Sequence, residues 1–344
     1  MYRLFRPLLF RLDPESAHQF TLQLLRLGGL PPFSAMLHAM YAAPDKPVEA
    51  FGLKFKNPVG LAAGYDKDGV AIRGLSALGF GHIEIGTVTL RPQPGNPKPR
   101  IFRLVEDEAV INHMGFPGKG ADFAAKSLQK ILKGRRRKDT LIGVNLGKNK
   151  DTPLEEAAQD YVTLMRQFIF MADYLAINIS SPNTVGLRRL QGREMLELLL
   201  STIAKECQTI ALGRGGNAPI LVKLAPDLSE DELDDAVDVI LRTGMDGIIA
   251  TNTTLARDGL RSKSQAESGG LSGRPLTGQA DEVLARVVKK VGGRIPVVGV
   301  GGIMSPEDAQ RKLDLGATLV QVYTSLVYAG PGLVKAINKK LRKP

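Results

Sequence analysis

The stretch Tyr174–Asn183 reads YLAINISSPN. Its first four residues, Tyr174–Ile177, are apolar or β-favouring, and the hexapeptide Asn178–Asn183 that follows places two carboxamides around a pair of serines. Enzymes built on parallel β/α units keep their chemistry where the strands end, so this pattern predicts a strand that leads into a functional site. An open alternative is a serine–proline turn in which Asn183 bonds its own backbone.

Similar β-rich runs recur along the chain with helix-length segments between them, as in a parallel sheet of βα units. The predicted strands are Val59–Ala63, Ile83–Gly86, Leu141–Val144, Tyr174–Ile177, Ile220–Val222, Gly247–Ala250, Val297–Val300 and Leu319–Val322. Helix candidates include 155–172, 194–212, 230–243 and 306–315, of which the last two begin after the capping residues Ser229 and Ser305. Eight alternating units predict an α/β fold, a closed (β/α)8 TIM barrel.

Polar residues follow the predicted strands more often than expected if the strand ends served only to turn the chain. They are Lys67, Thr87, Asn145, Asn178, Lys223, Thr251 with Asn252, Gly302 and Tyr323. Each could be a simple turn residue, but together they predict a site at one mouth of the barrel. Two long excursions, about 90–117 and 255–278, are expected to be lids or binding elements.

The serine pair does not look like an acylated nucleophile. The four histidines form no obvious triad motif, and no Gly-x-Ser-x-Gly elbow surrounds Ser180 or Ser181. Ser181 therefore reads as a proton acceptor in a preorganised pocket.

The glycine cluster 299–303 and the segment Tyr323–Ser325 follow the last two strands, where barrels commonly hold a phosphate. Simple tight turns are the alternative. Because the chain has neither a G-x-G-x-x-G unit opening a Rossmann fold nor a Walker lysine motif, the phosphate is expected to belong to a mononucleotide.

Four asparagines at the mouth offer donors and acceptors that suit a flat cyclic amide; they are Asn112, Asn178, Asn183 and Asn252. Lys67 could pair with a carboxylate on that ring, and Lys223 could stabilise negative charge on an electron-rich heterocycle as it accepts a hydride. Both lysines could instead be surface charges.

The composition of the chain limits the classes of protein and of partner that remain. The 344 residues are 43% hydrophobic, and the single cysteine, Cys207, allows no internal disulfide and no cysteine-based zinc cluster, so no metal is expected. The net charge of +11 favours acidic partners, but zero tryptophan and 6% aromatic residues argue against a nucleic-acid surface. No apolar run reaches the ~20 residues of a membrane span. The basic run 135–138 is expected to be a solvated loop.

Several motifs resemble one family closely: 57–64 (NPVGLAAG), 83–89 (IEIGTVT), 91–97 (RPQPGNP), 177–183 (INISSPN), 250–254 (ATNTT) and 270–273 (GLSG). Over nearly its whole length the chain resembles the class 2, quinone-dependent dihydroorotate dehydrogenases. That family consists of FMN-containing (β/α)8 enzymes of pyrimidine biosynthesis.

The resemblance implies a set of site residues. FMN would be bound by Ala63, Gly64, Lys67, Thr87, Asn145, Asn178, Lys223, Thr251, Gly273, Gly302, Tyr323 and Thr324, with its phosphate on the last three. Dihydroorotate would contact Lys67, Asn112, His113, Met114, Gly115, Phe116, Asn178, Asn183, Asn252 and Thr253, and leave as orotate.

Ser181 corresponds to the base that removes the C5 proton of the substrate, while the C6 hydride passes to the flavin. A serine has too high a pKa to act alone, so proton transfer would be coupled to hydride departure or relayed through water. The soluble class 1 enzymes carry cysteine at this position, so the serine points to class 2. The chain departs from the family at His113, where arginine is common.

Residues 1–45 read as amphipathic helices that precede a catalytic domain of residues 46–344. In the first, Leu4, Phe5, Leu8, Leu9 and Leu12 share one face and Arg3, Arg6 and Arg11 the other, with Phe10 as the exception. These helices could simply pack on the barrel, or they could form a monotopic seat on an anionic membrane.

The resemblance favours the membrane, because quinone is lipid-soluble and must reach the flavin. It places His18, Arg103 and Tyr323 at the quinone site. Since no long transit peptide precedes the helices, the cytoplasmic face of a bacterial inner membrane is the expected location.

Three other functions remain open from sequence. They are a flavin-free barrel lyase or isomerase acting on a phosphorylated substrate, a non-enzymatic membrane adaptor, and a flavin barrel oxidising another dihydropyrimidine. A carboxylate-bearing substrate opposite Lys67 argues against the last.

Overall fold

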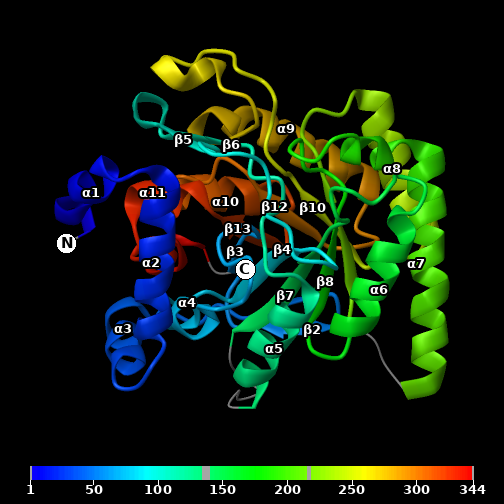
Figure 1. Ribbon diagram of the computed structural model, residues 1–344, viewed down its shortest axis with the longest axis horizontal. Coiled ribbons are helices and arrows are strands. Elements are labelled where there is room, and N and C mark those ends of the chain that lie inside the picture. The colour runs from blue at the N-terminus through cyan, green and yellow to red at the C-terminus, as the bar shows by residue number, and fades with distance from the viewer. Residues whose placement is uncertain (1, 134–139, 215–217, 343–344) are drawn as a thin grey trace.

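Eight parallel strands close into a barrel in a computed structural model that describes residues 2–133, 140–214 and 218–342 (Figure 1). In spatial order they are β3 (Val59–Leu61), β4 (His82–Val88), β7 (Leu141–Leu146), β8 (Tyr174–Asn178), β9 (Ile220–Leu224), β10 (Gly247–Ala250), β12 (Val297–Val300) and β13 (Leu319–Val322). Parallel pairing of β13 with β3, with Val320 opposite Val59, closes the ring. The predicted TIM barrel is therefore confirmed.

All eight predicted strands are present, and three of them have the predicted bounds. Every residue of the eight strands is buried, because one face packs inside the barrel and the other against helices. Such strands read as nearly continuous apolar runs, which made them visible in the sequence. The basic run 135–138 lies outside the described residues.

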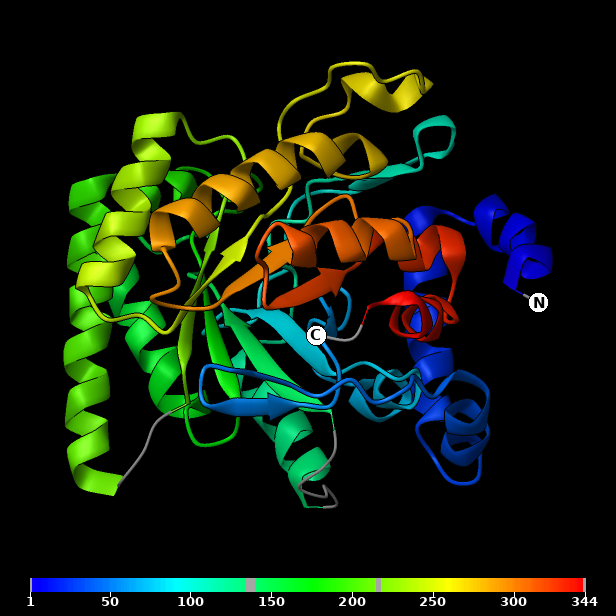
Figure 2. The ribbon, with the colours of Figure 1, turned by 180° about the vertical axis from the view of Figure 1, so that it is seen from behind.

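A ring of helices surrounds the barrel (Figures 1 and 2). It consists of α4 (Ile72–Ala77), α5 (Ala121–Leu132), α6 (Ala157–Phe168), α7 (Arg193–Arg214), α8 (Glu230–Arg242), α9 (Thr277–Val291), α10 (Pro306–Asp314), α11 (Thr324–Ala329) and α12 (Leu333–Lys340). The two predicted caps are confirmed: Ser229 forms a capping box with Glu232, and Ser305 accepts from the Asp308 backbone amide.

A hairpin closes the amino-terminal end of the barrel. It is formed by β1 (Val48–Ala50) and β2 (Leu53–Phe55), and Phe55 packs edge-on against the His82 ring at 5.3 Å. A Cβ on Gly60 would lie 2.0 Å from His82 Nε2, so only glycine leaves room for this ring. The barrel is therefore filled at this end, and its cavity lies at the other.

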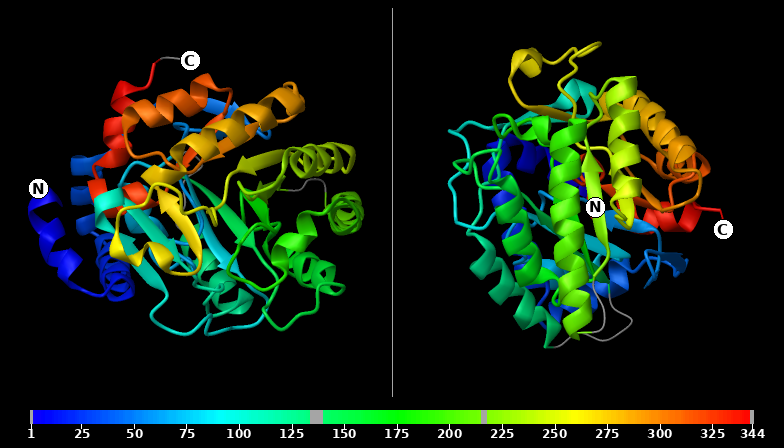
Figure 3. Two further views of the ribbon diagram at one scale, coloured as in Figure 1. Left: turned by 90° about the horizontal axis from the view of Figure 1, so that it is seen from above. Right: turned by 90° about the vertical axis from the view of Figure 1, so that its right-hand side faces the viewer.

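The two predicted excursions meet in a small antiparallel sheet over the carboxyl end of the barrel. Strands β5 (Ile101–Leu104) and β6 (Ala109–Asn112) come from the first excursion, and β11 (Gly270–Gly273) comes from the second. Because β6 pairs with both β5 and β11, the two excursions form one structural unit (Figure 3, left).

Three amino-terminal helices stand together at one side of the barrel, α1 (Tyr2–Arg11), α2 (Pro14–Gly28) and α3 (Phe33–Tyr41). Asp13 caps α2 and Pro14 begins it. Glu15 of α2 forms a buried bidentate ion pair with Arg100, with contacts of 2.8 and 3.1 Å. None of the helices in the described ranges has the length and apolarity needed to span a membrane.

Helix α1 both packs on the protein and exposes an apolar face. Tyr2 donates to the Val327 carbonyl at 2.5 Å, and Arg6 donates to the Tyr328 carbonyl at 3.2 Å. Phe10, the exception to the predicted apolar face, packs edge-on against Tyr328. The exposed face carries Leu4, Phe5, Leu8 and Leu12. The docked face therefore includes Arg6, which the sequence pattern had placed on a solvent face.

Candidate active site

One cavity of about 820 Å³ opens at the carboxyl end of the barrel and continues between the amino-terminal helices. It contains nearly all of the site residues that the sequence suggested. Those lining it are His18, Ala63, Gly64, Lys67, Thr87, Arg103, Asn112, Met114, Gly115, Phe116, Asn178, Ser181, Asn183, Lys223, Thr251, Asn252, Thr253, Gly273, Gly302, Tyr323 and Thr324.

Two predicted residues do not line this cavity. Asn145 is fully buried one layer below it, where its carboxamide contacts Thr87, Asn178 and Glu84. His113 turns away, because its Nδ1 lies 3.1 Å from the Ser268 carbonyl. The side chain of His113 therefore does not reach a ligand in this cavity.

The two serines of the hexapeptide have different surroundings. Ser180 is fully buried, and its hydroxyl lies 3.2 Å from Asn178 Oδ1 and 3.0 Å from Asn252 Nδ2. Ser181 lines the cavity, and its Oγ accepts from the Asn183 backbone amide at 3.3 Å. Only the second hydroxyl of this pair therefore faces a ligand.

Asn183 holds a site position, and its carboxamide does not bond its own backbone as the alternative turn required. Its Nδ2 donates to Asn112 Oδ1 at 3.1 Å, which joins the hexapeptide to the end of β6. Its Oδ1 is buried and has no hydrogen-bond partner among the described residues. Buried carbonyl oxygens are almost always paired, so this acceptor is suited to an N–H donor of a ligand.

The two mouth lysines are not surface charges. Lys67 Nζ donates to the Gly64 carbonyl at 2.6 Å, and burial lowers the pKa of Lys67 to about 8, so the ammonium form still dominates at pH 7. Lys223 is 5% exposed, and its Nζ lies 3.8 Å from Glu84 Oε1. Both amino groups therefore lie inside the cavity, where they can reach a ligand.

A glycine turn follows β12, packs against the start of α9 and lines the cavity together with the start of α11. Gly301 and Gly302 have φ values of +102° and +68°, and a Cβ on Gly302 would lie 2.3 Å from the Thr277 backbone. The nearby Ser325 hydroxyl is buried without a partner among the described residues. Free hydroxyl and amide donors beside a glycine turn fit a phosphate group.

The other arm of the cavity is apolar and lies between α1, α2 and α3. Three rings mark its junction with the barrel: Tyr65 lies edge-on to His18 at 4.9 Å and to Tyr323 at 5.8 Å. Burial lowers the pKa of His18 to about 3, with a smaller contribution from the positive charge of Lys67. His18 is therefore neutral in this arm at pH 7.

Arg103 lines the same arm, but its guanidinium is already engaged. It donates to the carbonyls of Leu9, Phe10 and Leu12 and lies 4.7 Å from the centre of the Phe10 ring. Arg103 therefore holds the carboxyl end of α1 against β5, in addition to lining the cavity.

Residues that the sequence analysis missed hold the mouth in place. Gln93 donates to the carbonyls of Gly115 and Phe116 at 3.0 and 3.1 Å, and Asn96 donates to those of His113 and Asn183. Both residues belong to the motif 91–97, which the sequence identified only as one shared with the resembled family. No sequence periodicity identifies side chains that brace a loop.

Glu84 was also missed. It is fully buried inside the barrel and contacts Asn145, Tyr174, Gln321 and Lys223. A carboxylate within the otherwise apolar run of β4 is the signal that could have identified it, because a buried charge needs partners. No group of three or more His, Cys, Asp or Glu within the described ranges is arranged to hold a metal ion.

Sequence comparison gives a family with this architecture. The family model for dihydroorotate dehydrogenase matches residues 47–344. Proteins described as dihydroorotate dehydrogenase (quinone) are 48% identical in Roseiflexus, 49% in Paraburkholderia phymatum and 49% in Escherichia coli. These alignments cover 97 to 100% of this chain and 94 to 98% of the relatives.

Solved structures agree with the sequence relatives. The DHODH of Eimeria tenella in complex with ferulenol has a TM-score of 0.87 and 39% identity to this chain, over 95% of this chain and 90% of its own. The ligand-free form of that protein gives the same TM-score with 40% identity. The likeness extends beyond the barrel into the amino-terminal helices, since so little of either chain lies outside the match.

Proposed function

The chain belongs to the dihydroorotate dehydrogenase family and has the activity of its quinone-dependent members, and on that premise we propose how its residues divide the work. We propose that FMN is bound at the mouth of the barrel, that dihydroorotate lies between it and Ser181, and that quinone enters through the apolar arm. The observation that carries the proposal is that residues of all three sets, except Asn145 and His113, line a single cavity.

FMN fits the residues that are present. The Gly301–Gly302 turn and the segment Tyr323–Thr324 would hold its phosphate, and the buried Ser325 hydroxyl is a further donor. The ring would lie against Lys223 with Ala63, Gly64, Lys67, Thr87, Asn178, Thr251 and Gly273, and Asn145 would act from below by holding Thr87 and Asn178. When bound, FMN supplies the ring that accepts a hydride from the substrate and returns the electrons to quinone.

Dihydroorotate is an anion with alternating N–H and C=O groups, and the proposed pocket complements both features. Lys67 pairs with its carboxylate, and the buried Asn183 Oδ1 accepts from a ring N–H. The remaining contacts come from Asn112, Met114, Gly115, Phe116, Asn178, Asn252 and Thr253. His113 would act only through the backbone of this segment.

Ser181 would take the C5 proton. It is the hexapeptide serine that faces the cavity, and within the described ranges only the Asn183 amide donates to its Oγ, so one lone pair remains available. No histidine contacts it among the described residues, so the proton is passed on as the hydride leaves or through water.

The apolar arm would bring quinone to the flavin, with His18, Arg103 and Tyr323 at its inner end. A neutral His18 can donate a hydrogen bond from its ring N–H to a quinone carbonyl. The exposed apolar faces of residues 1–45 would lie on an anionic membrane. We propose peripheral attachment at the cytoplasmic face of a bacterial inner membrane.

The proposal is tested by adding dihydroorotate anaerobically to the purified protein while following its visible absorbance, and then adding a soluble quinone. We expect a flavin band that bleaches with dihydroorotate and recovers with quinone. A yellow protein that bleaches but is not reoxidised would contradict the proposed quinone arm. A colourless protein would contradict the proposed FMN site.

A further inference from the structure

Glu84 of β4 lies inside the barrel directly below the mouth and is completely buried. Oε1 accepts from Asn145 Nδ2 at 2.8 Å and lies 3.8 Å from Lys223 Nζ. Oε2 accepts from Gln321 Nε2 at 2.9 Å and from the Tyr174 hydroxyl at 3.2 Å. Every group around the carboxylate is therefore a donor.

A carboxylate with only donors around it dictates how its neighbours are oriented. An ionised carboxylate can only accept, so it can face the NH2 of Asn145 but not its oxygen. Gln321 has the matching orientation. It keeps Nε2 on Glu84 although its Oε1 is buried without a partner among the described residues.

The orientation of Asn145 passes to the next carboxamide. With its NH2 on Glu84, Asn145 presents Oδ1 to the other side, where it accepts from Thr87 Oγ1 at 2.6 Å and from Asn178 Nδ2 at 3.0 Å. Asn178 Nδ2 also donates to Thr87 Oγ1 at 2.9 Å. Both hydrogens of the Asn178 amide are thus turned toward the barrel interior.

The same direction continues to the residues that line the cavity. Asn178 presents Oδ1 upward, where it accepts from Asn252 Nδ2 at 3.3 Å. Asn252 also donates to Ser180 Oγ at 3.0 Å, and its Oδ1 accepts from the Thr253 backbone amide at 2.8 Å. A single direction of donation therefore runs from Asn252 through Asn178 and Asn145 down to Glu84.

We propose that Glu84 is a positioning residue that fixes the donor and acceptor ends of Asn145, Asn178 and Asn252, and with them the hydrogen-bonding pattern offered to the substrate ring. The inference rests on the proposed function, because the ligand used to test it is orotate. Without a fixed direction, each carboxamide can rotate by 180° with little change in shape.

The decisive variant is Glu84→Gln, which keeps the shape but has one oxygen where glutamate has two. If that oxygen faces Gln321 and Tyr174, it retains two of the hydrogen bonds, and the new NH2 forces Asn145 to turn over. If it faces Asn145, Gln321 can turn over and accept from the new NH2 through its unpaired Oε1, so all variants are made in a Gln321→Leu background, which is the reference protein and leaves the Tyr174 hydroxyl to donate to the oxygen. We expect orotate to bind about tenfold or more weakly, measured by its perturbation of the flavin spectrum.

A second substitution should restore the direction. In the double variant Glu84→Gln/Asn145→Asp, the glutamine NH2 donates to one oxygen of the carboxylate introduced at position 145, and the other oxygen still accepts from Thr87 and Asn178. We expect orotate affinity within about threefold of the reference protein. A glutamate that only filled space or stabilised the fold would not be rescued by moving the carboxylate one residue along the hydrogen-bonded chain.

Tyr174→Phe is the matched control, since it removes a donor to Oε2 without reversing any amide. It should leave orotate affinity unchanged within about threefold. The inference is overturned if Glu84→Gln binds orotate as tightly as the reference protein. It is also overturned if the single and double variants, with equal flavin content, are weakened alike. Flavin content and orotate response of the unaltered protein separately test the proposed function.

Discussion

At the scale of single residues, the adjacent serines Ser180 and Ser181 differ because one is enclosed and the other faces the cavity. Ser180 is fully enclosed and hydrogen-bonded to two asparagines, whereas Ser181 faces the cavity. The two hydroxyls have the same intrinsic chemistry, so only their surroundings separate a structural serine from the one proposed for proton transfer.

Replacing Ser181 with alanine should slow flavin reduction by dihydroorotate by about 10²- to 10⁴-fold, since the proposed proton acceptor is lost. The measurement is anaerobic stopped-flow absorbance at saturating dihydroorotate. Reoxidation by quinone should be unaffected, because Ser181 has no part in it. Reduction at an unchanged rate would remove Ser181 from the mechanism.

His82 should make stability depend on pH. Burial lowers its pKa from 6.5 to about 3, and its ring nitrogens have no partners among the described residues. The unfolded chain binds a proton at His82 more readily than the folded protein does. The free energy of unfolding therefore keeps its full value above about pH 6.5 and falls as the pH drops toward 3.

We expect the loss of thermal stability between pH 7 and 5 to be smaller in His82→Phe than in the unaltered protein. The exposed His38→Phe should keep the original pH dependence. Melting temperatures measured at several pH values test this. Equal slopes for all three proteins would show that His82 does not contribute.

At the scale of elements, the site depends on segments far apart in sequence. Strand β11 completes the sheet that the first excursion begins, and Glu15 ties α2 to Arg100 before β5. Arg100 also donates to the carbonyls of Pro94 and Asn96. One buried guanidinium therefore joins the amino-terminal helices to the segment that covers the mouth.

Glu15→Gln should loosen α2 without unfolding the barrel. Burial by itself raises the pKa of Glu15, but the hydrogen bonds and charge of Arg100 outweigh it and hold the pKa below its ordinary value. Loss of the charged partner should speed hydrogen exchange in α2 by roughly ten- to hundredfold, or ~1.5–3 kcal/mol.

Glu49→Gln is the control, because its ion pair with Lys54 is exposed and should contribute little. Its exchange pattern in α2 should match that of the unaltered protein. If Glu15→Gln gave the same protection of α2 as this control, the buried pair would not be what docks the helix.

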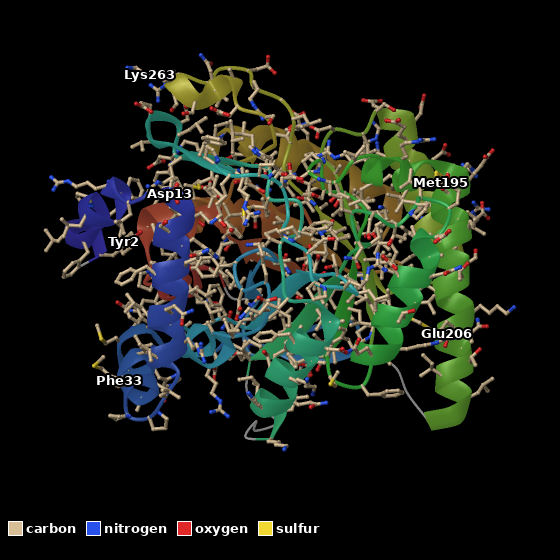
Figure 4. All side chains as sticks on the ribbon, in the orientation of Figure 1. Tyr2, Asp13, Phe33, Met195, Glu206 and Lys263 are labelled. Atoms are coloured by element: carbon tan, nitrogen blue, oxygen red, sulfur yellow. The ribbon has the colours of Figure 1, made fainter. Side chains whose placement is uncertain are left out.

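At the scale of the whole molecule, the amino-terminal helices and α7 lie on opposite sides of the barrel, as the labelled Phe33 and Glu206 show (Figure 4). Both sides expose apolar residues, but only the helices α1 to α3 border the cavity. A membrane seat at this end would place the lipid next to the apolar arm.

The double variant Leu4→Ser/Leu8→Ser should bind anionic vesicles at least about tenfold more weakly, since these side chains are 78% and 58% exposed and free to enter lipid. Vesicle co-sedimentation measures the change. The matched control is Leu198→Ser/Leu212→Ser on α7, which should bind as before. A similar loss in both variants would contradict a membrane seat at the amino-terminal helices.

The sequence by itself determined the eight strands, the polar residues after them and hence the location of the mouth. Strands buried on both faces are continuous apolar runs, and a polar residue that ends such a run is visible without any knowledge of its neighbours. The residues themselves suggested roles for Ser181, Lys67 and Lys223, the resemblance added the cofactor and substrate these roles would serve, and the structure collected the three residues in one cavity.

Only the tertiary structure decided which side chains support that mouth and which way they point. The side chain of His113 turned out of the cavity, Arg103 went to the carbonyls of α1, and Glu84 became the anchor of a carboxamide chain. The physical reason is that these outcomes depend on partners up to hundreds of residues away in sequence. Local patterns record burial and backbone preference, but a hydrogen-bond direction is set only when donor and acceptor meet.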